Sequence, residues 1–189
     1  MHYCHQKRII HRDLKLNNIV FASPNSREIR VVDFGISGLY AANNADKSLA
    51  GSLKYMAPEI LTGENTAADP AIDIFSMGVI LFSLVTGKLP FDGKDTNTIR
   101  NKIIKSIYQY PSNSQVSKSC RNLIDEMLLR DPKQRIKMKQ IFKHEWITPM
   151  HRKLNPMNNI HSDSLNSSLN SKISCNSQSP GFPDEFPND

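Results

Sequence analysis

The stretch from Asp73 to Leu84 constrains the fold of this chain more than any other segment. It is apolar almost all round a helical turn, whereas a helix on the surface of a domain carries apolar side chains along one stripe. Thr86-Gly87-Lys88-Leu89-Pro90 follows, and glycine and then proline are typical of a helix end. We therefore predict a helix buried at the centre of a domain, with Asp73 as its N-terminal cap.

The rest of the chain supplies enough residues to surround such a helix. A chain of 189 residues is ordinarily one domain, and its apolar content of 39% is that of a globular protein. We predict further helices over residues 95–107, 117–129 and 138–143. From residue 155 onward Ser and Asn dominate without any helical stripe. We therefore predict a folded domain over residues 1–149 and a disordered tail over residues 150–189.

Cysteine usage and hydropathy bear on where the protein resides. The three cysteines are odd in number and far apart, which indicates reduced thiols inside a cell. The longest apolar run, Met77 to Val85, is too short to cross a bilayer, and the N-terminus has no signal-peptide pattern. We expect an intracellular protein, cytoplasmic or nuclear, without a membrane partner.

Basic residues outnumber acidic ones, and the net charge is +6. A basic balance can indicate binding to nucleic acid. Here the basic residues are scattered, and no aromatic platform is interleaved with them. We therefore predict no nucleic-acid partner.

Histidine and cysteine side chains gather near the N-terminus, at His2, Cys4, His5 and His11. Zinc sites usually draw their ligands from two spaced pairs, and no second pair follows here. The segment from Met1 to Lys7 is better explained as the end of a helix, followed by a packed histidine.

Two apolar runs flank a polar loop in the same region. Ile9-Ile10 precedes the loop and Ile19-Val20-Phe21 follows it, so we predict strand, loop, strand. A turn at Ser23-Pro24-Asn25 then leads to a β-branched run from Ile29 to Val32. The pattern predicts a β-hairpin. The expected fold class is mainly α with a small β-hairpin layer.

Oxygen-bearing side chains stand in the loop and just after the hairpin. Asp13 and Asn18 lie in the loop, and the hairpin should return Asp33 to the neighbourhood of Asn18. Mg²⁺ accepts a carboxylate, an amide oxygen and phosphate oxygens, so Asn18 and Asp33 suit that ion. Asp13 is left free to accept a hydrogen bond from an attacking hydroxyl. Phosphoryl transfer requires such groups.

These residues resemble motifs of the eukaryotic protein kinases. His11 to Asn18 fits the catalytic-loop pattern H-R-D-L-x-x-x-N, Asp33-Phe34-Gly35 fits the magnesium-binding triplet, and Ala57-Pro58-Glu59 fits the end of the activation segment. Within the serine/threonine kinases, the pattern is most similar to the calmodulin-dependent and AMP-activated group. The resemblance covers about residues 1–149 and corresponds to the larger, C-terminal lobe of the kinase fold.

The resemblance implies ATP and Mg²⁺ as cofactors and protein hydroxyls as substrates. Asp13 would orient the hydroxyl, and Lys15 would steady the γ-phosphate. Asn18 and Asp33 would hold the metal ion. Val20 would form the floor beneath the adenine, and as a strand residue we expect it to be buried.

The resemblance also implies regulation through phosphorylation by an upstream kinase. Arg12 would hold the phosphate of the activation segment, because a planar donor fork suits phosphate geometry. Ser48 stands three residues before Gly51, at the position that carries the activating phosphate in this group. Ser37 and Ser52 also offer hydroxyls in the segment. Ser52 replaces the threonine that bonds the catalytic aspartate and lysine.

Five residues have structural roles in the family pattern. His11 stacks beneath Phe34, Glu59 forms a buried ion pair with Arg135, and Asp73 accepts backbone hydrogen bonds from the catalytic loop.

Two functions are compatible with this sequence. The ordered set of motifs favours a serine/threonine protein kinase. However, no Gly-rich loop, strand lysine or partner glutamate of the smaller lobe precedes Met1 in the sequence. The alternative is therefore a catalytically silent kinase lobe that acts as a scaffold or docking module.

Overall fold

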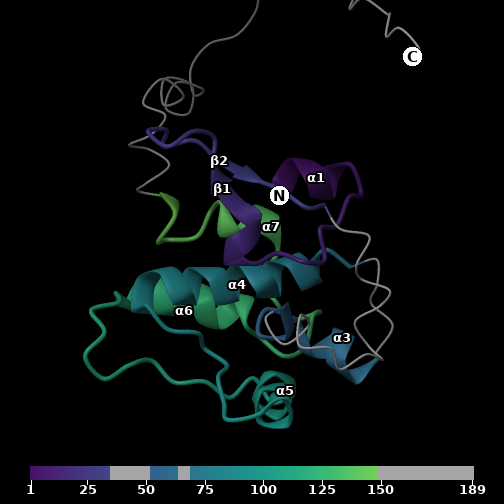
Figure 1. Ribbon diagram of the computed structural model, residues 1–189, viewed down its shortest axis with the longest axis vertical. Coiled ribbons are helices and arrows are strands. Elements are labelled where there is room, and N and C mark those ends of the chain that lie inside the picture. The colour runs from purple at the N-terminus through teal and green to yellow at the C-terminus, as the bar shows by residue number, and fades with distance from the viewer. Residues whose placement is uncertain (35–51, 64–68, 149–189) are drawn as a thin grey trace, which may run out of the picture. The chain divides into compact units, whose positions relative to one another are not determined.

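A computed structural model describes residues 1–34, 52–63 and 69–148 (Figure 1). This part of the chain is mostly helical and contains one two-stranded antiparallel sheet, so the predicted fold class is confirmed at this level. The predicted tail and Ser48 lie outside these residues. The elements in chain order are α1 (His2–Gln6), the 3₁₀ turn η1 (Leu16–Asn18), β1 (Ile19–Phe21), β2 (Ile29–Val31), α3 (Pro58–Thr62), α4 (Ala71–Thr86), α5 (Thr96–Ile104), α6 (Lys118–Met127) and α7 (Met138–Ile141).

Helix α4 is the predicted central helix, and apolar side chains are buried on several of its sides. It is the longest described helix, with 16 residues, and of its apolar side chains only Leu84 is largely exposed, at 67%. Gly87 ends the helix in the left-handed conformation, with a φ of 70°. Its backbone N–H donates to the carbonyl of Ser83 at 2.9 Å. Glycine adopts this conformation without steric cost, as predicted for the helix end.

The start of α4 differs from the prediction. The helix begins at Ala71 with Pro70 at the N-cap position, so Asp73 is the third helical residue and not the cap. Asp69 instead accepts a hydrogen bond from the backbone N–H of Ala71 at 2.8 Å. The Asp73 carboxylate is completely buried and accepts hydrogen bonds from the backbone of His11 and Arg12. It therefore binds this loop and does not cap its own helix.

Two clusters of buried apolar side chains form the core, and α4 contributes to both. The first contains, among others, Phe75, Val79, Phe82, Phe91, Ile103, Ile124 and Leu128. The second consists of Ile74, Leu123, Met127, Ile136 and Ile141. A helix that supplies two clusters must be apolar on more than one face, which is the physical reason for its composition.

Gly78 allows α4 and α6 to approach each other. A Cβ atom at this position would lie 2.9 Å from the Cβ of Met127 and 2.9 Å from a methyl carbon of Leu128. Both distances are shorter than a normal carbon contact, so any larger residue would force the helices apart.

Helices α5 and α6 begin at predicted positions and have side-chain caps. The carboxylate of Asp95 accepts the backbone N–H of Thr98 at 2.8 Å, and the Ser117 hydroxyl accepts that of Cys120 at 3.2 Å. The hydrogen bonds from Thr98 lower the pKa of Asp95. Both helices, like α7, end a few residues earlier than predicted.

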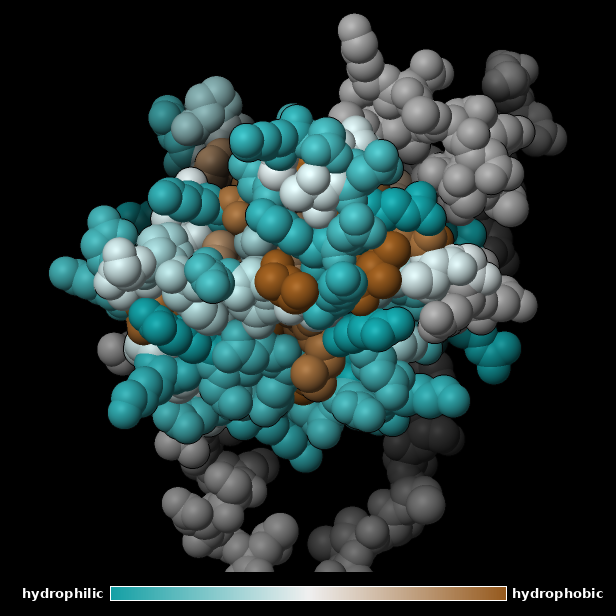
Figure 2. All heavy atoms as spheres, turned by 90° about the horizontal axis from the view of Figure 1, so that it is seen from below, coloured by the Kyte–Doolittle hydropathy of each residue, from teal (hydrophilic) through white to brown (hydrophobic). Residues whose placement is uncertain are grey.

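The face that carries α5 is mainly hydrophilic. Figure 2 views the molecule from this end and shows small hydrophobic groups scattered among hydrophilic side chains. Ile99 and Ile103 of α5 point into the core, at 7% and 0% exposure. Across the described ranges, no helix combines the length and apolar character that a membrane span requires.

The predicted hairpin forms, but Val20 is not buried. Strands β1 and β2 pair in an antiparallel register that places Ile19 opposite Val31 and Phe21 opposite Ile29. Val20 is 39% exposed and Phe21 is 67% exposed. Burial was the wrong expectation for Val20, because a sheet of two short strands cannot cover its own faces.

The predicted strand at Ile9-Ile10 is absent. The chain turns at Arg8, which has a φ of 61°, and the backbone N–H of Ile9 donates to the carbonyl of Cys4 at 2.8 Å. These contacts close the end of α1. The two β-branched residues Ile9 and Ile10 therefore do not form a strand. Ile9 is not buried either, since it is 48% exposed.

A buried ion pair joins α3 to the loop between α6 and α7. The Arg135 guanidinium donates to both oxygens of Glu59, at 2.6 and 2.9 Å, and both side chains are almost completely buried. The remaining donors of Arg135 bond the carbonyls of Ala71, Leu129 and Arg130. Its guanidinium lies 5.0 Å from the centre of the Phe75 ring. Every charge in this arrangement therefore has a partner.

Arg135→Met should lower the free energy of unfolding by about 3–5 kcal/mol, because the Glu59 carboxylate would remain buried without its partner. Urea unfolding followed by circular dichroism measures this change. Arg30→Met is the matched control, because Arg30 forms a 3.7 Å pair with Glu28 in which both side chains are mostly exposed. It should cost less than about 0.5 kcal/mol. Equal losses in the two variants would contradict the role assigned to the buried pair.

Candidate active site

The loop between His11 and Asn18 is closed by its own hydrogen bonds. The Asn18 side-chain amide donates to the Asp13 carbonyl at 2.8 Å, and the Asn18 backbone N–H donates to the Lys15 carbonyl at 3.0 Å. Asn18 is only 3% exposed and ends the η1 turn just before β1. The hydrogen bonds fix the loop so that the Asp13 and Asn18 side chains share one side of it.

The Asp13 carboxylate lies at the centre of a polar cluster. Its Oδ2 accepts from the Lys15 ammonium at 2.7 Å and from the Asn18 amide at 3.3 Å. The Lys15 ammonium also donates to the Ser52 hydroxyl at 3.0 Å, which joins the catalytic loop to the segment before α3. The Asp13 and Lys15 side chains are 24% and 23% exposed, so a substrate can reach both. Within the described ranges, no hydrogen bond joins Ser52 to Asp13.

The hairpin brings the chain at Asp33 back to Asn18. The backbone N–H of Val32, the residue before Asp33, donates to the Asn18 carbonyl at 2.9 Å. Asp33 itself has a φ of 56°, a conformation that residues other than glycine rarely adopt. The Asp33 side chain is exposed, and its carboxylate has no hydrogen-bond or ion-pair partner in the described part of the chain.

Asn18 and Asp33 fit a magnesium ion by their chemistry. The Asn18 amide uses its nitrogen for the hydrogen bonds to Asp13, which leaves its oxygen available as a ligand. The Asp33 carboxylate supplies the charged oxygen donor that Mg²⁺ prefers, and phosphates and water normally complete such a site. Residues 1–34, 52–63 and 69–148 contain no group of three or more His, Cys, Asp or Glu side chains that could hold a metal.

The His11 ring connects the catalytic loop to the end of the hairpin. It is fully buried, its Nε2 donates to the Val32 carbonyl at 2.9 Å, and its Nδ1 accepts from the Asp13 backbone N–H at 3.3 Å. The ring centre lies 4.7 Å from that of Phe34. His11 therefore contacts the residues on both sides of Asp33, through the Val32 carbonyl and the Phe34 ring, and helps to set its conformation.

Asp73 of α4 holds the start of the same loop. Its carboxylate accepts the backbone N–H groups of His11 and Arg12, each at 2.9 Å. The Nε2 atom of His5 donates to the same carboxylate at 2.7 Å. This contact of His5 was not predicted from the sequence. No local pattern indicates this contact, because it joins α1 to a helix that lies 68 residues further along the chain.

Arg12 follows with a strained backbone and an unpaired side-chain nitrogen. Its φ is 68°, and the hydrogen bond of its backbone N–H to Asp73 holds it in this conformation. The Nε atom is buried and has no hydrogen-bond partner among the described residues. A buried, unpaired guanidinium nitrogen indicates a missing acceptor.

The segment that leads into α3 is anchored to the helical core. The Ser76 hydroxyl of α4 donates to the Tyr55 carbonyl at 2.7 Å, and the Lys54 ammonium donates to Asp92 at 2.8 Å. The hydrogen bond from Lys54 lowers the pKa of Asp92. Together with the Glu59 ion pair, these contacts place Ser52 beside Lys15. Val20 lies on β1 with its side chain partly open to solvent.

Comparison with known proteins identifies the class. The family model described as "Protein kinase domain" matches residues 1–147. The chain is 38% identical over 148 residues to "Probable serine/threonine-protein kinase MARK-A" of Dictyostelium discoideum. It is 36% identical over 145 residues to "Protein kinase kin1" of Schizosaccharomyces pombe, and 42% identical over 145 residues to the human "SNF-related serine/threonine-protein kinase". The alignments cover 78%, 77% and 77% of this chain.

The chain therefore belongs to the protein kinase family, and its relatives are serine/threonine kinases of the group that the motifs predicted. It spans only 14%, 16% and 18% of the lengths of these three relatives.

Asp73→Asn should release the start of the catalytic loop. An asparagine offers one acceptor oxygen, so its amide group would face either the His11 or the Arg12 backbone N–H, and one of these donors would lose its acceptor. We expect a loss of about 1–3 kcal/mol in stability and faster hydrogen exchange at these two amides, measured by NMR. Asp95→Asn is the control, because asparagine caps a helix as well as aspartate does. Unchanged exchange at His11 and Arg12 in Asp73→Asn would refute the proposed anchoring.

Proposed function

We propose that this chain carries the catalytic groups of a serine/threonine protein kinase, which transfers the γ-phosphate of ATP to hydroxyl groups of proteins. The observation that carries the proposal is the Asp13 carboxylate, which lies 2.7 Å from the Lys15 ammonium in a loop closed by Asn18. Because the chain belongs to the protein kinase family, we interpret this geometry as a site of phosphoryl transfer.

Asp13 receives the substrate hydroxyl. Its Oδ2 is occupied by Lys15 and Asn18, and the other carboxylate oxygen is available to accept a hydrogen bond from the hydroxyl. The hydroxyl oxygen then forms a bond to the γ-phosphorus as the bond to the β-phosphate oxygen breaks and ADP leaves. The hydroxyl proton is lost late, so a weakly basic carboxylate suffices.

Lys15 and the metal site act on the phosphate. The Lys15 ammonium is held between Asp13 and Ser52, where it is oriented toward charge that develops on the γ-phosphate. Asn18 and Asp33 would hold Mg²⁺, which when bound supplies charge neutralisation for the phosphate oxygens. Val20, on the exposed face of β1, would contact the adenine. The need for ATP supports an intracellular location.

Arg12 would respond to phosphorylation of the activation segment. Its buried Nε has no acceptor in the described part of the chain, and a phosphate supplies several strong acceptors and about two negative charges. Ser48 is the proposed site of that phosphate. Phosphate binding to Arg12 would order the catalytic loop through the backbone that Arg12 shares with His11 and Asp13.

Asp13→Asn should reduce phosphoryl transfer by roughly 10²–10⁴-fold, because an amide accepts the hydroxyl proton poorly. The measurement is transfer of radiolabelled phosphate from ATP to a serine peptide by the full-length protein. Asp95→Asn is the matched control, since it makes the same chemical change at an exposed helix cap outside the site. Thermal melting verifies that both variants are folded. Full activity in Asp13→Asn would refute the proposed role of this residue.

Arg12→Gln should make activity independent of phosphorylation. In the wild-type protein, phosphatase treatment should lower transfer by about tenfold, because a charge-assisted contact to Arg12 is lost. The Arg12→Gln and Ser48→Ala variants should both start at the lower rate and show no response. Mass spectrometry locates the phosphate. A phosphate on Ser37 or Ser52 with none on Ser48 would contradict the assigned position.

A second candidate function is that of a non-catalytic docking module. The observation that favours it is the exposed apolar surface of the hairpin, where Phe21 is 67% and Ile29 is 58% exposed. The transfer assay separates the two functions. Phosphoryl transfer that depends on Asp13 supports the kinase, whereas binding of a partner without any transfer supports the docking module.

A further inference from the structure

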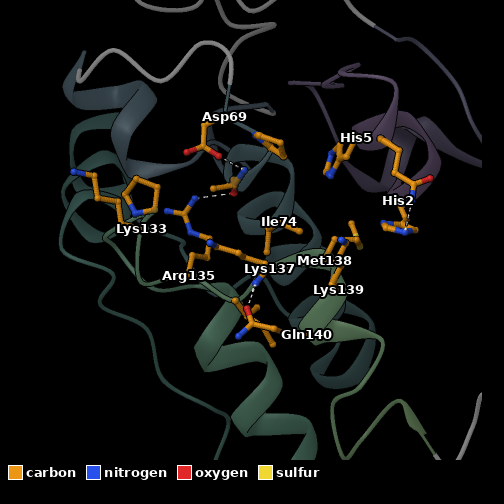
Figure 3. A pocket seen from close by; sticks show the side chains of 15 residues that line it. His2, His5, Asp69, Ile74, Lys133, Arg135, Lys137, Met138, Lys139 and Gln140 are labelled. Carbon is orange, nitrogen blue, oxygen red and sulfur yellow. Dashed lines mark hydrogen bonds between the residues drawn. The ribbon is translucent and has the colours of Figure 1, made fainter.

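A cleft of about 710 Å³ lies between α1, the start of α4 and the segment that leads into α7 (Figure 3). Its apolar lining is contributed by Pro70, Ile74, Pro132, Ile136 and Met138. The volume lies within the range of ligand-binding pockets. None of the proposed catalytic side chains lines it, so the cleft is separate from the candidate active site.

The charges around the cleft are predominantly positive. Lys133, Lys137 and Lys139 line it, and none of them forms an ion pair with another described residue. Arg135 is neutralised by its buried partner Glu59. Asp69 is the single acidic residue in the lining, and one of its oxygens already accepts the backbone N–H of Ala71. The cleft therefore attracts a ligand with several negative charges.

A buried and unpaired nitrogen also lies in the wall of the cleft. The His5 side chain is only 7% exposed, and its Nε2 donates to Asp73 at 2.7 Å. The other ring nitrogen, Nδ1, is buried and has no hydrogen-bond partner in the described part of the chain. Because an unpaired buried polar atom is costly, a polar group that enters the cleft gains by contacting it.

We propose that this cleft is a docking site for a segment of a partner protein in which apolar side chains are interspersed with Asp or Glu. The apolar floor would bury the apolar side chains, which supply most of the affinity. The lysines would select for acidic residues and speed the encounter. The proposal concerns recognition and goes beyond the proposed phosphoryl transfer.

The arrangement of the lysines favours a peptide over a fatty acid. Figure 3 shows Lys133 at one end of the cleft and Lys139 toward the other, with Lys137 between them. A fatty acid carries one carboxylate and would neutralise one of these cations. A peptide that bears several acidic side chains can pair with all of them while its apolar side chains enter the cleft.

A fluorescence titration tests the proposal directly. Trp146 is the sole tryptophan of the chain, and it packs against the core cluster that contains Ile74 and Ile136 of the cleft. The probe is a short synthetic peptide in which Phe and Leu alternate with Glu. We expect a saturable change in tryptophan emission at micromolar peptide, weakened by added salt. A peptide with Ser in place of Phe and Leu should not bind.

Charge-reversal variants locate the site. Lys137→Glu combined with Lys139→Glu should weaken peptide binding by about tenfold or more, because two attractive contacts become repulsive. Lys118→Glu combined with Lys143→Glu is the matched control. It changes the net charge equally at two exposed lysines outside the lining, and it should bind as the wild type does.

Three results would overturn the proposal. They are the absence of saturable peptide binding, an equal loss of affinity in the two double variants, and tight binding of laurate without binding of the peptide. The last result would assign the cleft to a lipid. Because the titration needs no ATP, its outcome is independent of the outcome of the transfer assay.

Discussion

The carboxylate of Asp73 is the contact on which the position of the catalytic loop depends. It is completely buried, and it accepts hydrogen bonds from the His11 and Arg12 backbones and from the His5 ring. A carboxylate can be buried in this way only when such donors compensate for lost water. The loop is therefore attached to α4, the longest described helix. Since His5 also lines the cleft, its ring connects the cleft to this carboxylate.

Two further contacts bring the segment before α3 to the loop that Asp73 anchors. The Glu59–Arg135 pair attaches α3 to the same core, and Lys15 spans from Asp13 to Ser52, in the segment just before α3. The strained backbones of Arg12 and Asp33 persist because neighbouring hydrogen bonds over-determine them. The strain lies at two residues for which we propose roles in binding phosphate and metal. The packed core thus holds conformations that the isolated segments would not adopt.

The sequence-based predictions were wrong where the environment of a residue depends on segments that are distant in the sequence, because a local pattern does not show which segments these are. The β-branched composition of Ile9-Ile10 predicted a strand, but the turn at Arg8 leads those residues back to α1. Val20 was expected to be buried, although a two-stranded sheet leaves it 39% exposed. Aspartate is a common helix-capping residue, so Asp73 was predicted to cap α4. Its carboxylate instead accepts a hydrogen bond from the backbone of His11, which lies 62 residues earlier in the chain. Each error concerns which distant segment comes to lie beside the residue.

The sequence by itself determined the helices α1, α4, α5, α6 and α7, the hairpin, and the chemical types at Asp13, Asn18 and Asp33, because these depend on periodicity, turn residues and motif spacing. It also indicated the kinase family. Only the tertiary structure decided that His5 bonds Asp73, that a buried nitrogen of Arg12 has no hydrogen-bond partner among the described residues, and that three lysines line one cleft with an apolar floor. These features join residues that are far apart in the chain. Their free energy comes from packing and desolvation, which local sequence does not encode.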